Sequence, residues 1–449
     1  MHNKYKTVTT DIFAIDISEW VDGVRDIYLL YSPLADGMCV ANSSEINELS
    51  DILSGCKSNN KDYKDVIENL RPDYSLLTSL SETPDEFVKM SILPNYKCNF
   101  SCQYCYSASG RSNQEIQLSK LIAAFDYFLR PLGERDNKRS LFISGGGEPF
   151  LSWEILREGL NYAFENAQNA QICLDIHFIT NGSLITDDII SFVKEHKCSI
   201  CISFEILEDL QNTLRGSYSK VCATIDALLE NRISPMINST ITPVSVNRLP
   251  EMINHIINRW KGIHTITMEP VTAVEMFSTI NDISTFYDSF ELNFAEAQKI
   301  AIQYGISLNC SYKGISEHVG QRYCPGKLCL NASGTFTICH CASSPKEDRY
   351  SKCSYGEIDE LNQVRFDLDK YRSLIGVNLY TNDKCVECFA KFNCAGGCMT
   401  RNDQYPKEYL EIVCRFTRKM LLKELIDKLN TSYYESFGYS LNDYIKQII

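Results

Sequence analysis

The chain has 449 residues, of which 44% are hydrophobic and 11% aromatic, and its formal net charge is −13. That length exceeds what one hydrophobic core usually supports, so we expect two or three domains, and the negative charge argues against a general binder of nucleic acid or anionic membranes. The first residues lack the layout of a signal peptide, and no apolar run reaches the roughly 18 residues of a membrane helix. These features predict a cytoplasmic protein.

Residues 1–85 read as a small α+β unit. Two β-rich runs, residues 27–31 and 38–41, flank an Asp36-Gly37 turn and predict a hairpin, and a helix is expected to start at Ser43. A small sheet with an exposed edge can accept an extended peptide as an added strand. A structural lid is the alternative reading of this unit.

Residues 86–306 alternate short apolar runs with helical patterns. Six such units, at a spacing of roughly 30 residues, are typical of βαβ crossovers in a parallel sheet. They predict an α/β fold, a partial (β/α)6 TIM-like barrel rather than the complete eight-unit barrel. The predicted strands end near residues 93, 143, 179, 204, 241 and 271. In such barrels the chemistry lies at the carboxyl ends of the strands.

The loop after the first of these strands carries Cys98, Cys102 and Cys105 in Cys-x3-Cys-x2-Cys spacing. Cytosolic thiols stay reduced, which favours metal binding over a disulfide scaffold. Three thiolates can hold three irons of a four-iron cluster and leave the fourth iron open. A structural zinc site is the alternative, but zinc takes four ligands in paired spacings, and no fourth ligand lies nearby in the sequence.

The loop after the second strand reads Ser144-Gly145-Gly146-Gly147-Glu148-Pro149. Consecutive glycines let a ligand approach the backbone closely, and the carboxylate beside them suits an ammonium group. The spacing is not that of a dinucleotide-binding loop. Taken alone, the stretch is equally compatible with an ordinary tight turn.

Together, the cysteine loop and the Gly-Gly-Glu-Pro turn resemble the radical S-adenosylmethionine (radical SAM) family. The resemblance covers residues 87–304 and implies that Cys98, Cys102 and Cys105 bind a [4Fe–4S] cluster. It further implies that the amino and carboxylate groups of SAM chelate the open iron. Transfer of one electron would then cleave the sulfonium and give a 5'-deoxyadenosyl radical, which abstracts a hydrogen from the substrate.

The same resemblance implies a set of SAM contacts at the carboxyl ends of the predicted strands. Tyr104 and Val271 are implied to lie beside the adenine, and Arg215 to bind the carboxylate. The amino group is implied to contact Gly146, Gly147 and Glu148. Ser203 and Glu205 stand at the end of the fourth strand, with Glu205 implied to contact the ribose. The sequence departs from the family pattern here, because Glu205 stands where relatives have aspartate and the following glycine is absent.

The last third of the chain is rich in cysteine. Eleven of the 20 cysteines lie between residues 310 and 414. Seven of them follow the pattern Cys324-x9-Gly334-x4-Cys339, then Cys385-x2-Cys388-x5-Cys394-x3-Cys398, then Cys414. This pattern resembles the SPASM extension of radical SAM enzymes, which carries auxiliary iron–sulfur clusters. Paired zinc sites are the alternative reading of such spacings.

By this resemblance, four cysteines complete one auxiliary [4Fe–4S] cluster and three hold another, so the chain would carry three clusters. The implied ligands of the first are Cys385, Cys388, Cys394 and Cys414, and those of the second are Cys324, Cys339 and Cys398. The fourth position of the second cluster is open to Cys310, Cys329, Cys341, the substrate or no ligand. The predicted domains are 1–85, 86–306, 307–430 with the SPASM region, and a tail, 431–449.

SPASM enzymes mostly modify peptides or proteins, so the resemblance implies a maturase of ribosomally made precursor peptides that installs a thioether or carbon–carbon crosslink. An external one-electron donor, such as flavodoxin or ferredoxin, is the other implied partner. A formylglycine-generating sulfatase maturase is an alternative, although His340 stands where those enzymes have an aspartate base. A small-molecule dehydrogenase and a non-enzymatic iron–sulfur electron carrier are the remaining alternatives.

Overall fold

The computed structural model describes residues 5–21, 24–57, 63–77, 80–132 and 137–448. Its contacts divide the chain into two compact units. The first comprises Met1–Leu80, Ser311–Cys324 and Val377–Ile449, and the second comprises Ser81–Cys310 and Pro325–Gly376. The four predicted domains stay a prediction, and residues 307–430 contribute to both units. In the described part of the chain, no helix has the length and apolarity needed to cross a membrane.

An antiparallel sheet of four strands in the order β1-β2-β3-β4 forms the start of the first unit. Its elements are β1 (Tyr5–Thr9), β2 (Ile12–Asp16), β3 (Tyr28–Ser32), β4 (Gly37–Ala41), α1 (Ser43–Leu53) and α2 (Lys64–Asn69). Strands β3 and β4 pair as the predicted hairpin. Helix α1 starts at the predicted Ser43 because Asn42 and Glu45 form a capping box.

Helices and loops from the C-terminal part of the chain cover one face of this sheet. They are a π-helical turn at Lys391–Ala395, α13 (Lys407–Phe437) and α14 (Leu441–Ile448), while α12 (Met399–Gln404) lies between this turn and α13 in the sequence. Side chains of β2 and β3 such as Phe13 and Leu29 share a core with Leu425 of α13 and with Phe389. The other face, which includes Leu30, packs against α1 and α2. Both faces of the sheet are therefore buried.

The second unit is built on the predicted partial barrel. Six parallel strands pair in chain order, as predicted. They are β5 (Lys89–Leu93), β6 (Lys138–Ile143), β7 (Cys173–Thr180), β8 (Ser199–Ser203), β9 (Met236–Ile241) and β10 (Thr265–Pro270). Burial alternates along them, as in β7, where Ile176 and Phe178 are buried while His177 between them is half-buried.

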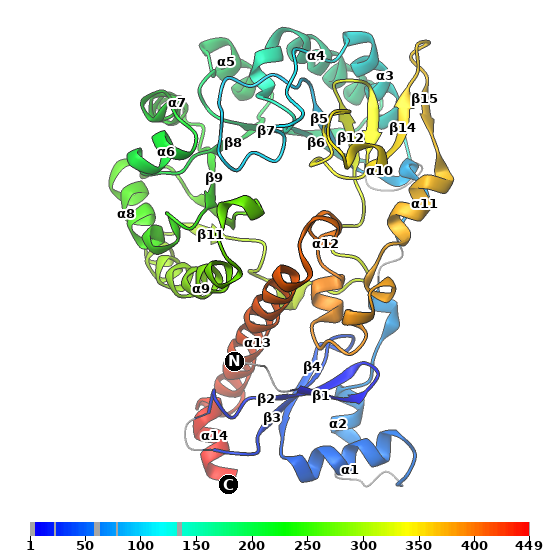
Figure 1. The fold of residues 1–449 in the computed structure, drawn as a ribbon, viewed down its shortest axis with the longest axis vertical. Coiled ribbons are helices and arrows are strands. Elements are labelled where there is room, and N and C mark those ends of the chain that lie inside the picture. The colour runs from blue at the N-terminus through cyan, green and yellow to red at the C-terminus, as the bar shows by residue number, and fades with distance from the viewer. Residues whose placement is uncertain (1–4, 22–23, 58–62, 78–79, 133–136, 449) are drawn as a thin grey trace. The chain divides into compact units, whose positions relative to one another are not determined.

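Helices follow the strands and lie around the outside of the curved sheet (Figure 1). They are α3 (Leu118–Phe128), α4 (Trp153–Asn169), α5 (Asp187–Glu195), α6 (Glu208–Leu214), α7 (Tyr218–Glu230), α8 (Leu249–Arg259) and α9 (Ile280–Gln303). In α4, the buried Trp153, Leu156 and Leu160 recur at helical spacing and face the sheet. The predicted fold class, a partial (β/α)6 barrel, is confirmed.

The sheet continues beyond the six predicted strands at both edges. β11 (Ser307–Asn309) pairs in parallel with β10, and β12 (Leu328–Asn331) pairs in parallel with β5. The antiparallel strands β13 (Thr335–Thr337), β14 (Ser354–Ile358) and β15 (Val364–Phe366) extend the β12 edge, with α10 (Tyr350–Cys353) and α11 (Leu368–Gly376) beside them. Strands of three to five residues carry too little periodicity to be predicted.

Candidate functional site

The cysteine loop and the Gly-rich turn lie in direct contact, although about 50 residues separate them in sequence. The Glu148 amide donates a 2.7 Å hydrogen bond to the Lys97 carbonyl, and the Asn95 side chain donates one to the Glu148 carbonyl at 3.0 Å. A Cβ on Gly147 would stand 1.8 Å from the Lys97 oxygen. Glycine at 147 is therefore required for the turn to approach the residue before Cys98.

We expect Gly147→Ala to push the turn away from the cysteine loop and to lower SAM affinity, with a packing cost of about 1–3 kcal/mol. The measurements are isothermal titration with SAM and thermal unfolding of the anaerobically reconstituted protein. Gly376→Ala is the matched control, because an added Cβ there meets no atom of the described residues within 4 Å. Equal SAM affinity in both variants would contradict the close approach.

The Glu148 carboxylate is buried and links the ends of two strands. It accepts hydrogen bonds from the Thr180 hydroxyl at 2.6 Å, the Asn181 amide at 2.7 Å and the Phe150 amide at 3.3 Å. Burial raises the pKa of Glu148, and these hydrogen bonds partly offset that shift. Glu148 thus fixes the turn after β6 against the end of β7, and its contact with the SAM amino group stays a prediction.

Tyr104, Glu205 and Arg215, all predicted SAM contacts, interact with one another. The Tyr104 hydroxyl donates to the Glu205 carboxylate and accepts a 3.0 Å hydrogen bond from Arg215. Glu205 has no exposed surface and also accepts from the Ser239 hydroxyl at 2.9 Å and the Thr240 amide at 3.1 Å. With these donors around it, the Glu205 carboxylate positions Tyr104 and Arg215, while its contact with the ribose stays a prediction.

Arg215 retains one donor for a ligand. Among the described residues, its Nε–H is buried and has no hydrogen-bond partner, and its side chain is 12% exposed. A buried, unpaired donor is costly unless a ligand accepts its hydrogen. The carboxylate of SAM is an acceptor of the kind that this N–H needs. Arg215 therefore fits the group implied for it.

The other predicted SAM contacts stand at the carboxyl ends of their strands. Ser203 is the last residue of β8, and Val271 follows β10, where its amide donates to the Ile241 carbonyl at 2.8 Å. Gly146 has φ of +68°, and a Cβ there would lie 2.7 Å from the Asn95 carbonyl. The predicted residues are thus brought to one end of the sheet, and their roles stay predictions.

The three loop cysteines line one cavity of about 520 Å³. Arg111 lines it too, and its Nη2 lies 3.2 Å from the Cys105 sulfur. Burial raises the pKa of the Cys102 and Cys105 thiols, so binding to iron would have to displace their protons. In the part of the chain that the structure describes, no three His, Cys, Asp or Glu side chains are grouped for a single metal ion. An iron–sulfur cluster is larger than a single metal ion, and a cavity shared by the three cysteines suits it. The cluster assignment stays a proposal.

Tyr106, His340 and Lys327 lie beside this site and were not predicted. The rings of Tyr106 and His340 are 6.0 Å apart, and the Lys327 Nζ is 2.9 Å from the His340 Nδ1. Tyr106 leaves 40% of its surface accessible, yet desolvation by surrounding atoms raises its pKa. In the sequence, the position of Tyr106 directly after Cys105 could have indicated that Tyr106 lies at this site.

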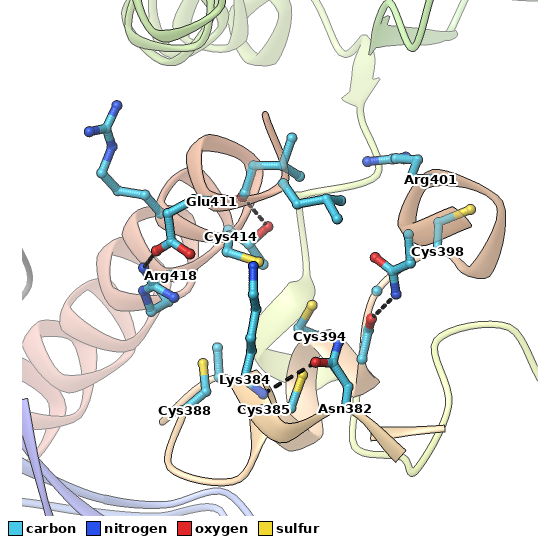
Figure 2. A pocket seen from close by; sticks show the side chains of 18 of the residues that line it. Asn382, Lys384, Cys385, Cys388, Cys394, Cys398, Arg401, Glu411, Cys414 and Arg418 are labelled. Atoms are coloured by element: carbon cyan, nitrogen blue, oxygen red, sulfur yellow. Dashed lines mark hydrogen bonds and ion pairs between the residues drawn. The ribbon is translucent and has the colours of Figure 1, made fainter. Parts of the chain in front are cut away.

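A second cysteine cavity, of about 810 Å³, lies in the first unit. Figure 2 shows the side chains of Cys385, Cys388, Cys394 and Cys414 gathered around one part of it, with Cys398 at another side beside Arg401. Burial raises the pKa of Cys385 to about 11 and raises that of Cys394 further. This cavity holds the complete cysteine set that was implied for one auxiliary cluster, and that assignment too stays a proposal.

The ligands implied for the other auxiliary cluster belong to different units. Cys324 and Cys398 fall in the first unit and Cys339 in the second, so this set remains a prediction. Of the three candidates for its fourth ligand, Cys310 and Cys329 are buried, and Cys341 is half-buried.

A buried ion pair behind the second cavity was also missed from the sequence. The Lys391 Nζ lies 2.6 Å from Asp11 and donates to the carbonyls of Thr10 at 2.8 Å and Val386 at 3.2 Å. Lys391 is 4% and Asp11 5% exposed. The pair ties the turn between β1 and β2 to the segment between Cys388 and Cys394. A lysine and an aspartate so far apart in sequence gave no signal of this contact.

Comparison with known proteins agrees with this geometry. Residues 92–256 match the model of the radical SAM superfamily. The chain is 20% identical to the radical SAM cyclopropyl synthase TigE of Paramaledivibacter caminithermalis, over 74% of this chain and 72% of that protein. It is 19% identical to a cysteine-type anaerobic sulfatase-maturating enzyme of Clostridium perfringens, over 70% of this chain and 89% of that protein.

A solved structure shares the fold. The structure of native anSMEcpe with bound AdoMet and the Kp18Cys peptide superimposes with a TM-score of 0.60 at 17% identity, covering 76% of this chain and 98% of that one. The contact between the cysteine loop and the Gly-rich turn lies within the residues matched by the superfamily model. The chain therefore carries a radical SAM domain over residues 92–256 and resembles the maturases of that superfamily.

Proposed function

We propose that the chain is a peptide maturase that takes a hydrogen from a ribosomally made precursor and installs a thioether or carbon–carbon crosslink. The observation that carries this proposal is the N-terminal sheet. Both of its faces are buried, whereas its outer strand β1 pairs with β2 alone among the described residues. An edge strand offers unpaired backbone groups to which an extended peptide can bind as a further strand.

The radical SAM site would supply the chemistry for this modification. When bound by Cys98, Cys102 and Cys105, the [4Fe–4S] cluster with SAM supplies a 5'-deoxyadenosyl radical. Arg215 would bind the SAM carboxylate through its unpaired Nε–H, and the Gly146-Gly147 turn lets SAM approach the backbone. Tyr106 and His340 lie beside this site, where they would orient the substrate side chain and exclude water.

Auxiliary clusters and an electron donor complete the proposal. Cys385, Cys388, Cys394 and Cys414 would hold one auxiliary cluster in the 810 Å³ cavity, and Cys324, Cys339 and Cys398 would hold another. Each SAM cleavage consumes one electron, which an external donor such as flavodoxin or ferredoxin would deliver.

Maturation of a sulfatase is the second candidate function, because the sulfatase-maturating relatives align with most of this chain. That reaction needs a base beside Cys339, where His340 stands. Burial and then the Lys327 cation lower the pKa of His340. The Lys327 ammonium faces the Nδ1 at 2.9 Å, which leaves the hydrogen on Nε2. A ring with its acceptor nitrogen engaged is a poor base, and this favours crosslinking over formylglycine formation.

The two functions predict different products. We expect the reconstituted protein, given SAM, dithionite and the peptide encoded by a neighbouring short reading frame, to yield a peptide that has lost two hydrogen atoms per crosslink. Mass spectrometry with fragmentation locates the new bond, and 5'-deoxyadenosine should form in step with it. A peptide left unmodified while 5'-deoxyadenosine accumulates would count against this substrate class. Loss of a cysteine sulfur with appearance of an aldehyde would instead establish sulfatase-type maturation.

A further inference from the structure

One face of helix α13 points three charged or sulfur-bearing side chains into the 810 Å³ cavity. Glu411, Cys414 and Arg418 recur at spacings of three and four residues, which places them on the same side of a helix. All three line the cavity that also contains Cys385 and Cys388. Figure 2 shows Arg418 beside Glu411 at the rim of the cysteine group.

Arg418 lies beside both an acid and the cysteine group. Its Nη2 is 3.3 Å from the Glu411 Oε1, and it lines the same cavity as Cys388, with which it interacts electrostatically. Only 18% of the Arg418 side chain is exposed, so water screens these interactions incompletely. The guanidinium has five N–H donors, enough to serve the carboxylate and the sulfur at once.

The cavity as a whole carries more cations than acids. Its lining includes six basic side chains, Lys384, Lys391, Arg401, Lys407, Arg415 and Arg418, and two acidic ones, Glu408 and Glu411. Lys391 forms an ion pair with Asp11, and Arg418 forms one with Glu411. Four thiolates outweigh the positive charge of an oxidised iron–sulfur core, so a bound cluster is anionic, and one-electron reduction makes it more so. The excess of cations suits such an occupant.

We propose that Arg418 is a positioning residue that raises the reduction potential of the auxiliary cluster held by Cys385, Cys388, Cys394 and Cys414. The proposal rests on the cluster assignment made above. Hydrogen bonds to the sulfurs and the charge around a cluster set its potential. The Arg418 cation, which lines the cavity together with these cysteines, stabilises the reduced, more negative state more than the oxidised state. Glu411, which draws on the same guanidinium, has the opposite effect.

The test is an anaerobic redox titration of the full chain, monitored by electron paramagnetic resonance. Cys98, Cys102, Cys105, Cys324, Cys339 and Cys398 are replaced by alanine, so that neither the radical SAM cluster nor the other auxiliary cluster contributes a signal. Arg418→Gln is expected to lower the equilibrium constant for reduction about tenfold, a fall of about 59 mV in midpoint potential. Glu411→Gln is expected to raise the potential, and Arg418→Lys to fall between Arg418→Gln and the parent. Lys423→Gln is the matched control on the same helix, because Lys423 does not line the cavity, and it should shift the potential least.

The outcomes separate the tuning role from the cluster assignment. An unchanged midpoint potential in both Arg418→Gln and Glu411→Gln, at unchanged iron content, would overturn the role of Arg418. An equal shift in Lys423→Gln would overturn it as well. If Arg418→Gln loses its iron, the midpoint potential of Glu411→Gln is the test. A raised potential supports the role of Arg418, and an unchanged one overturns it. Iron content that stays the same after Cys385→Ser and Cys388→Ser would instead overturn the cluster assignment itself.

Discussion

Replacing Cys98, Cys102 and Cys105 together by alanine is expected to reduce SAM cleavage to the level of a protein-free control. These cysteines are the only set implied to leave an iron open for SAM, and they share one cavity beside the Gly-rich turn. The C-terminal cysteines lie in other parts of the chain and should keep their iron. The measurements are 5'-deoxyadenosine by liquid chromatography after reduction with dithionite, and iron per chain.

The matched control replaces two exposed cysteines, Cys56 and Cys173, by alanine, which should leave cleavage and iron unchanged. Cleavage that survives the triple substitution would refute the assignment of the catalytic cluster. Loss of all iron, rather than part of it, would refute the separate auxiliary sites.

Asp11→Asn is expected to destabilise the first unit by about 3–5 kcal/mol and to remove iron from the auxiliary cavity, because it leaves the Lys391 ammonium buried without a counter-charge. Lys391 stands between Cys388 and Cys394, so a shift of its backbone displaces two of the proposed ligands. Urea denaturation and iron analysis of the reconstituted protein measure both effects. SAM cleavage should be affected least, because the radical SAM cysteines belong to the second unit.

Two further variants make this prediction specific. The double variant Asp11→Leu with Lys391→Met removes both charges and should recover much of the lost stability, since an apolar pair of similar size avoids the unpaired charge. Asp369→Asn breaks an exposed pair with Arg372, in which Asp369 is 99% exposed, and should change neither stability nor iron. An Asp11→Asn protein as stable as Asp369→Asn would show that the buried pair contributes little.

The sequence was most informative where local patterns determine local structure. The hairpin of β3 and β4 and the start of α1 at Ser43 depend on nearby residues, and they form where predicted. The six strand–helix units could be predicted equally well, because apolar residues recur at the period of a strand or a helix within each element. The cysteine loop and the Gly-rich turn also lie at the carboxyl ends of neighbouring parallel strands, as predicted for such a barrel.

Contacts that depend on the packing of distant segments could not be predicted. Glu205 shows this, since nothing near it in sequence predicts that its carboxylate accepts hydrogen bonds from Tyr104 and Ser239. The pairing of β12 with β5 escaped prediction for the same reason, because four residues carry no periodic signal and the partner lies more than 200 residues earlier. Asp11 and Lys391 each look like ordinary surface charges in sequence.

The core shared by the N-terminal sheet and the segment around Lys391 has a consequence for biosynthesis. Thr10 and Lys391 are 381 residues apart, and Tyr31 donates a 2.9 Å hydrogen bond to Asn393 across 362 residues. A ribosome releases the chain from its N-terminus, and segments fold as their partners emerge. The 810 Å³ cavity can therefore close only when translation is almost finished, whereas the residues around Cys98 meet their Gly-rich turn much earlier. The site around Cys98 can accordingly form before the last cysteines of the cavity have been synthesised.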